Sequence, residues 1–322
     1  MRRFATKLAG SLLVVLFATC AWAQGYPNRP VKLIVPMTPG GGNDIVGRTV
    51  AQTLQARLHQ PIVIENRPGA GGNVGTEFVA RAPADGYTLL LVSNAQVMNP
   101  WMYKQLPFDI IRDFSPVAML ATLPMLVLTN PSLPVNSISE LIAYARANPG
   151  RLSYASPGVG TPHHLATELF KKTTGIDMVH VPYKGGAPAV TALIAGEVQV
   201  MFGVVATTLP HVKAGKLRAL ATAEARRIPM LPDLPTVAES GIEGFGVGIW
   251  FGIVAPSGTP AGVVAELSGE TRRVLELPQI RERLLAQGFV ISYQDPEEFR
   301  SAIAADYDKW GKVIRAVGVT AE

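Results

Sequence analysis

Val31-Lys32-Leu33-Ile34-Val35-Pro36-Met37-Thr38-Pro39-Gly40-Gly41-Gly42-Asn43-Asp44 is the stretch that decides the fold. Its apolar, β-branched start predicts a buried strand, and the glycine-rich segment that follows predicts a loop. Val46, Val50, Leu54 and Leu58 then recur every four residues, which predicts a helix with one apolar face. A strand, a loop and a helix in this order form the repeating unit of parallel α/β sheets.

The alternation of strands and helices continues along most of the chain. Residues 61–65 and 87–92 predict further strands, and residues 74–82 a second helix, which completes one β-α-β-α-β half of a doubly wound sheet. A second series predicts strands at 152–155, 178–183, 198–204 and 217–222 and helices at 137–147, 162–173, 187–195 and 207–214.

Two long apolar segments, residues 117–128 and 245–256, fit neither series, and we expect them to cross between two lobes as strands. The predicted fold class is therefore α/β with two lobes, each built on a doubly wound, mostly parallel sheet. Lobe 1 is expected to be discontinuous, with residues 24–124 plus 247–322, and lobe 2 to comprise residues 125–246.

The N-terminal 23 residues have the order of a secretory leader. Arg2, Arg3 and Lys7 precede an apolar run from Leu8 to Thr19, and Ala21-Trp22-Ala23 forms a signal-peptidase pattern. We expect cleavage after Ala23 and export, since the run is shorter than the roughly 20 residues of a membrane span. A retained membrane anchor is the alternative, and lipidation at Cys20 is disfavoured because the residues before it lack an aliphatic lead-in.

The composition excludes several classes of function. Cys20 is the only cysteine of the 322 residues and lies in the leader, so the mature chain has no thiol for redox work, metal binding or nucleophilic attack. The net charge of +5 falls to +2 without Arg2, Arg3 and Lys7. Lysine and arginine are scattered along the chain, and we expect no binding of nucleic acid.

Residues 36–44, called loop 1 below, join the first predicted strand to its helix. Ligands of doubly wound sheets bind at the carboxyl ends of the strands. Glycines allow the backbone to approach a ligand, and a helix N-terminus favours an anion. The alternative is a tight turn in which Asn43 caps the helix and Asp44 complements its dipole.

Residues 156–164, called loop 2, repeat this arrangement in the second series. Thr161 is a good N-cap, Pro162 a favoured first helical residue, and the next amides would face the same anion. His163 and His164 point about 100° apart on a helix and cannot chelate one metal ion together. His164 is expected to hold the loop or contact ligand, with plain packing as the alternative.

Residues 66–75, called loop 3, contain a Gly-x-Gly-x-x-x-Gly pattern that is similar to a dinucleotide fingerprint. The loop follows the second strand instead of the first, Pro68 stiffens it, and no acidic residue ends the next strand at Ser93-Asn94. We interpret it as a surface loop beside the ligand. The chain also lacks a nucleophile elbow and a zinc-protease motif, so we expect no enzyme, no cofactor and no metal.

Six motifs together resemble the Bug family of extracytoplasmic solute receptors, which serve tripartite tricarboxylate transporters. They are Val-Pro-x-x-Pro-Gly-Gly at 35–41, Glu-Asn-Arg-Pro-Gly-Ala-Gly-Gly at 65–72, Asp-Gly-Tyr-Thr-Leu-Leu at 85–90, His-Val-Pro-Tyr-Lys-Gly at 180–185, Leu-Pro-Asp-x-Pro-Thr-Val-Ala-Glu at 231–239 and Trp-Phe-Gly at 250–252. The resemblance implies a periplasmic-binding-protein-like fold that closes over a small carboxylate in the periplasm.

The resemblance also implies that loops 1 and 2 hold this ligand through backbone amides, Thr161 and bridging waters. The expected ligand-binding residues are Pro36, Thr38, Gly41, Gly42, Asp44, Asn94, Gly158, Gly160, Thr161, His164, Phe202 and Gly203. Relatives commonly read Val-Asp-x-Met-Phe-Asp where this chain has residues 198–203 without either acid. If Gly203 faces the cleft, an aromatic, dicarboxylic or uncharged-tail acid is favoured over an amino acid.

The expected partners are membrane permease subunits, and the chain is expected to act as a monomer. Two alternatives remain at this stage. A sensor subunit would bind the same solute but dock on a signalling membrane protein. A periplasmic enzyme acting on carboxylic acids would need a reactive group that the sequence does not reveal.

Overall fold

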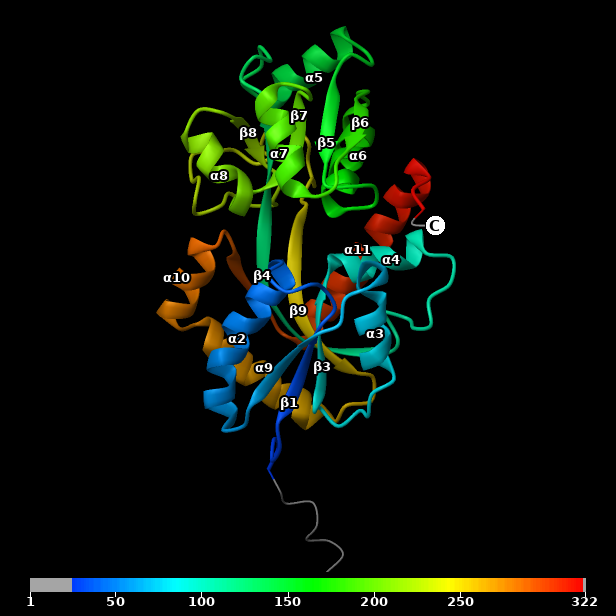
Figure 1. Ribbon diagram of the computed structural model, residues 1–322, viewed down its shortest axis with the longest axis vertical. Helices are drawn as coiled ribbons and strands as arrows, with labels where there is room; N and C mark the ends of the chain where they lie inside the picture. The colour runs from blue at the N-terminus through cyan, green and yellow to red at the C-terminus, as the bar shows by residue number, and fades with distance from the viewer. Residues whose placement is uncertain (1–24, 321–322) are drawn as a thin grey trace, which may run out of the picture.

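The computed structural model describes residues 25–320 and shows two α/β lobes stacked along the long axis of the molecule (Figure 1). The predicted leader and its cleavage site lie outside these residues. Among residues 25–320 the structure contains no helix with the length and apolar character needed to cross a membrane.

The elements follow the predicted alternation closely. The strands are β1 (Val31–Val35), β2 (Ile62–Asn66), β3 (Thr88–Ser93), β4 (Phe114–Thr129), β5 (Ser153–Ser156), β6 (Val179–Pro182), β7 (Val200–Val204), β8 (Arg218–Thr222), β9 (Gly248–Pro256) and β10 (Val290–Gln294). The helices are α2 (Gly42–Leu58), η2 (Ala70–Gly72), α3 (Asn73–Ala80), α4 (Asn94–Met102), α5 (Ile138–Ala147), α6 (Pro162–Thr174), α7 (Gly186–Ala195), α8 (Val205–Lys213), α9 (Ala261–Leu275), α10 (Pro278–Ala286) and α11 (Pro296–Val317).

The strand order is β2-β1-β3-β9-β4-β7-β5-β6, with β10 and β8 also paired to β4. In lobe 1, strands β1, β2, β3 and β4 run in one direction and β9 and β10 in the other. In lobe 2, strands β5, β6, β7 and β8 run in one direction and β4 in the other. Most strands of each lobe therefore point the same way, and the predicted two-lobed α/β fold is confirmed.

The two predicted crossover segments are strands β4 and β9, which run side by side between the lobes (Figure 1). Residues Phe114 to Pro124 of β4 pair with β9, and Met125 to Thr129 pair with β7. One strand thus belongs to both sheets, and its pairing partner changes after Pro124.

The last helix also connects the lobes. Helix α11 packs against α4 in lobe 1, and its Trp310, Val313 and Ile314 join the buried core that contains Phe170 and Phe202 of lobe 2. The assignment of all of residues 247–322 to lobe 1 therefore stays a prediction.

Candidate functional site

Loop 1 is held in shape by Asp44. The amide of Gly40 donates to Oδ2 of Asp44 over 3.0 Å, and Arg48 and Asn66 donate to the same carboxylate. Burial alone would raise the pKa of Asp44, but the hydrogen bonds from Arg48, Gly40 and Asn66 outweigh burial and hold this pKa below its usual range. Asp44 is thus a charged support of the loop whose two oxygens accept hydrogen bonds within the protein, and its contact with ligand stays a prediction.

The start of α2 has more hydrogen-bond donors than acceptors. Its N-cap, Gly41, has no side chain to receive the amides of the first turn, and no described group accepts from the amides of Gly42 or Asn43. The side-chain Nδ2 of Asn43 is also buried without a partner among the described residues. Asn43 is therefore not the N-cap that the turn alternative required, and the excess of donors suits an anion.

Loop 2 has the same construction with different residues. The amide of Gly160 donates to Nδ1 of His164 over 3.2 Å, and Thr161 caps α6 by accepting from the amide of His164. The hydroxyl of Thr161 donates to the carbonyl of Gly158 over 2.7 Å. The hydroxyl proton of Thr161 is therefore engaged within the loop. No described group accepts a hydrogen bond from the amides of Val159 and His163.

Three stacked aromatic rings hold loop 2 in place. The ring of His164 lies 4.0 Å from that of His180, which lies 4.8 Å from Tyr154, all measured between centroids. His180 Nε2 and the Ser156 hydroxyl are 2.7 Å apart. Burial lowers the pKa of His164, and burial together with the neighbouring His164 lowers the pKa of His180 to about 4. Both rings are neutral at pH 7, as the acceptor role of His164 Nδ1 requires.

Loops 1 and 2 meet at a hollow between the lobes with a volume of about 260 Å³. Met37 of loop 1, Gly71 of loop 3 and residues 159–162 of loop 2 line it together with one face of α4 and Thr320. Gly160 packs so closely on Met102 that a Cβ at Gly160 would lie 2.9 Å from the sulfur. Loop 3, interpreted as a surface loop beside the ligand, therefore forms one wall of this hollow.

Helix α4 is the part of the site that the sequence reasoning missed. Ser93-Asn94-Ala95-Gln96 forms a capping box, in which the Gln96 side chain accepts from the Ser93 amide over 2.9 Å. That pattern is readable in the sequence and predicts a helix start after the third strand. Asn99 of this helix donates to the carbonyl of Gly71 over 3.0 Å and so fixes loop 3.

The other predicted residues fall into two groups. Thr38, Gly41, Gly42 and Gly158 lie in the loops at least partly exposed. Four residues are buried and do not line the hollow, so their contact with ligand stays a prediction: Pro36 packs on Gly75, Asn94 donates to the carbonyl of Gly248, Phe202 packs on Phe170 and Phe245, and Gly203 lies against Leu128 and Thr208. Gly203 does not border the hollow, so an effect of its missing charge on ligand choice stays a prediction.

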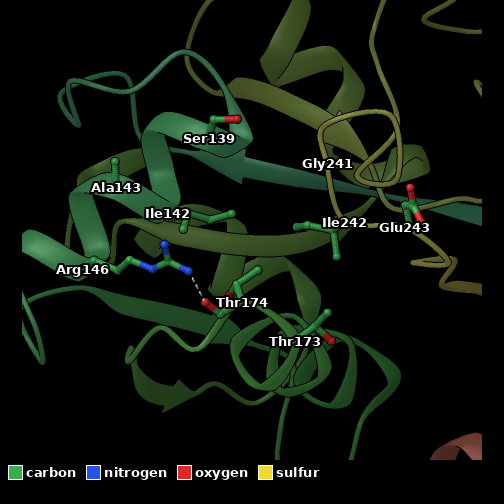
Figure 2. A pocket seen from close by; sticks show the side chains of 9 residues that line it. All are labelled: Ser139, Ile142, Ala143, Arg146, Thr173, Thr174, Gly241, Ile242 and Glu243. Carbon is green, nitrogen blue, oxygen red and sulfur yellow. Dashed lines mark hydrogen bonds between the residues drawn. The ribbon is translucent and has the colours of Figure 1, made fainter.

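A larger hollow of about 490 Å³ lies between α5, the end of α6 and residues 241–243 (Figure 2). Its arginine, Arg146, donates to the carbonyl of Thr174 over 2.8 Å. Thr174 ends a 13-residue helix whose other end borders loop 2. At about 1.5 Å per residue, this hollow lies some 20 Å from loop 2 and is not part of the site. Among residues 25–320 no cluster of three or more His, Cys, Asp or Glu side chains is placed to hold a metal ion.

Comparisons with known proteins agree with this architecture. A family model described as "Tripartite tricarboxylate transporter family receptor" matches residues 46–319. The chain is 38% identical to protein BugT of Bordetella pertussis over 298 residues, which cover 92% of this chain and 91% of BugT.

Two solved structures are similar over nearly their whole length. A protein of R. palustris, in a structure with adipate, is 36% identical with a TM-score of 0.76 and covers 92% of this chain and 99% of its own. MatC from Rhodopseudomonas palustris, with bound malate, is 32% identical with a TM-score of 0.72 and covers 90% of this chain and 100% of its own.

Proposed function

This chain belongs to the receptor family of tripartite tricarboxylate transporters, the Bug family, and on that premise we propose that it captures a small carboxylate between loops 1 and 2. In this proposal the protein works in the periplasm as a monomer and delivers its ligand to membrane permease subunits. It acts as a receptor and not as an enzyme.

The observation that carries the proposal is the excess of donors at the start of α2. The amides of Gly42 and Asn43 and the Nδ2 of Asn43 have no acceptor among the described residues, and the positive end of the helix dipole lies at the same place. Loop 2 adds the amides of Val159 and His163, which likewise have no acceptor among the described residues. A carboxylate satisfies donors of this kind without an arginine or lysine.

The relatives support the chemical class of the ligand. The adipate and malate in the two R. palustris structures are both carboxylates. Asp44 and His164 hold the loops in which the donors lie, which supports the proposal because the amides of each loop are ordered before a ligand binds.

Calorimetry of the mature chain with a panel of carboxylic acids tests the proposal, and mass spectrometry of co-purified ligand supplies candidates for the panel. Asn43→Ala should weaken carboxylate binding by about 1.5 to 3 kcal/mol, since it removes a donor to a charged group. It should cost little stability, because its Nδ2 has no protein partner to lose.

Thr271→Val is the matched control. Thr271 Oγ1 is likewise buried without a partner among the described residues, but it lies on α9, remote from both loops. This variant should bind as the unmodified chain does. Equal affinity of Asn43→Ala and the unmodified chain would remove α2 from the site, and turnover of any bound acid would favour the enzyme alternative.

A further inference from the structure

The hollow of about 260 Å³ at loop 2 has no charged side chain among the described residues that line it. Met37, Met102 and Val159 supply apolar surface from loop 1, α4 and loop 2. Its polar side chains are uncharged, and they limit which ligands the hollow can bind.

The polar groups beside Gly71 are largely engaged. Asn99 Nδ2 donates to the carbonyl of Gly71 over 3.0 Å and to Oδ1 of Asn73 over 2.6 Å. The Tyr103 hydroxyl lies at the same glycine, where a Cβ would be 3.0 Å from it. The hollow therefore offers a ligand uncharged polar side chains, those of Asn99, Tyr103, Thr161 and Thr320, and no cation among the described residues.

The hollow also adjoins the proposed carboxylate site. Met37 belongs to loop 1, and Val159 lines the hollow while its amide is one of the unpartnered donors of loop 2. A ligand whose carboxylate meets these amides therefore has its remaining atoms beside this apolar surface.

We propose that this hollow is the tail pocket of the receptor and that it selects monocarboxylates with an uncharged, preferably aromatic, tail over dicarboxylates. The inference rests on the proposed function. An apolar cavity of about 150 Å³ accommodates a benzene ring, so this hollow has room for an aryl group. The sulfur atoms of Met37 and Met102 favour contact with an aromatic ring. A second carboxylate would be desolvated here without a cationic partner.

Hexanoate and adipate provide the test, since both have six carbons and differ only in the second carboxylate. Calorimetry of the mature chain should show hexanoate binding at least about tenfold more tightly than adipate, and 3-phenylpropionate more tightly still. Adipate binding as tightly as hexanoate would overturn the inference and leave carboxylate capture intact. Failure of every acid to bind would instead count against the proposed function.

A charge added at the rim should weaken this preference. Val159 is 57% exposed, so Val159→Lys adds an ammonium group without disturbing a core. The ratio of adipate to hexanoate affinity should rise by about tenfold in this variant. Val179→Lys, at a valine that is 51% exposed on β6, adds the same charge elsewhere and should leave the ratio unchanged. An unchanged ratio in Val159→Lys would overturn the inference.

NMR of methyl-labelled methionines locates the tail independently of affinity. A bound phenyl ring should shift the methyl signals of Met37 and Met102 but not that of Met230, which packs in the outer core of lobe 2. Shifts confined to other methionines would place the tail elsewhere and overturn the inference.

Discussion

The amide of Gly160 donates a hydrogen bond to Nδ1 of His164, four residues further along the chain. In the other lobe the amide of Gly40 donates in the same way to Oδ2 of Asp44. Both glycines have positive φ, at +75° and +83°, and both acceptors are the third residue of a helix. The two lobes thus use one device, with different side chains, to present a glycine loop before a helix N-terminus.

Gly160→Ala should weaken ligand binding and lobe closure. The new Cβ would lie 2.9 Å from the Met102 sulfur, so that loop 2 would have to withdraw from α4. Calorimetry should show lower affinity, and scattering at saturating ligand a larger radius of gyration than for the unmodified chain.

Gly175→Ala is the control for this variant. Its φ is +66°, so it carries a similar backbone strain of about 1 kcal/mol, but no atom lies within 4 Å of the added Cβ. If Gly160→Ala and Gly175→Ala lower the ligand affinity equally, backbone strain and not the contact with Met102 explains the weaker binding. Unmodified protein with the same radius of gyration free and saturated would contradict closure itself.

Two histidines, His180 of the ring stack and His163, which precedes His164 in the chain, should make stability fall in mild acid. Unfolded histidine has a pKa near 6.5, whereas burial lowers the pKa of His180 and of His163 to about 4. Between these values the unfolded state binds protons that the folded state does not, so stability is lost as pH falls from about 6.5 to 4.

His180→Phe keeps a ring in the stack and removes one titrating group. The decrease in melting temperature between pH 7 and 5 should therefore be smaller than in the unmodified chain. His59→Asn, at an exposed position that ends α2, should leave the decrease as it is. Equal pH dependence in all three proteins would exclude His180 as a source.

Glu224→Gln should stabilise the protein above neutral pH. Burial raises the pKa of Glu224 to about 7, an effect that Lys309 partly opposes. The unfolded carboxyl ionises near pH 4.5 while the folded one keeps its proton, so stability is lost as pH rises from about 4.5 to 7.

The melting temperature of Glu224→Gln relative to the unmodified chain should therefore increase from pH 5 to pH 8. Glu243→Gln, at an exposed position, serves as the control. Because Glu224 packs on Gly248 at the start of crossover strand β9, we also expect a change in closure by scattering. If the melting temperatures of Glu224→Gln and the unmodified chain differ by the same amount at pH 5 and at pH 8, Glu224 is not a buried, protonated carboxyl.

Gly203→Ala should lower stability by about 1 to 3 kcal/mol and leave affinity unchanged. A Cβ at this position would lie 2.8 Å from Leu128 Cδ1 and 2.9 Å from Thr208 Cγ2, inside the core. Gly186→Ala, where no atom lies within 4 Å of the Cβ, is the control in denaturant unfolding. Altered ligand affinity in Gly203→Ala would return this position to the site.

Much of the fold could be predicted from local patterns. The strands and helices between residues 31 and 222 were readable because apolar periodicity and glycine or proline breaks mark them. Helix α4 was overlooked despite its capping box, and the helices after β9 were not predicted at all. The surroundings of Gly203 could not be predicted, because a family pattern identifies a position in the chain but not the face of the sheet that it occupies.

The sequence by itself determined the two α/β lobes, the crossover strands and the glycine loops before two helix starts, because each depends on neighbouring residues. Only the tertiary structure decided which polar groups are already satisfied. The side chains of Asp44 and Thr161 form hydrogen bonds within their own loops. The amides of Gly42 and Val159 have no acceptor among the described residues and are free to bind a ligand. It also brought loop 3 and α4 against loop 2, since contacts between lobes arise from packing over long separations that no local pattern encodes.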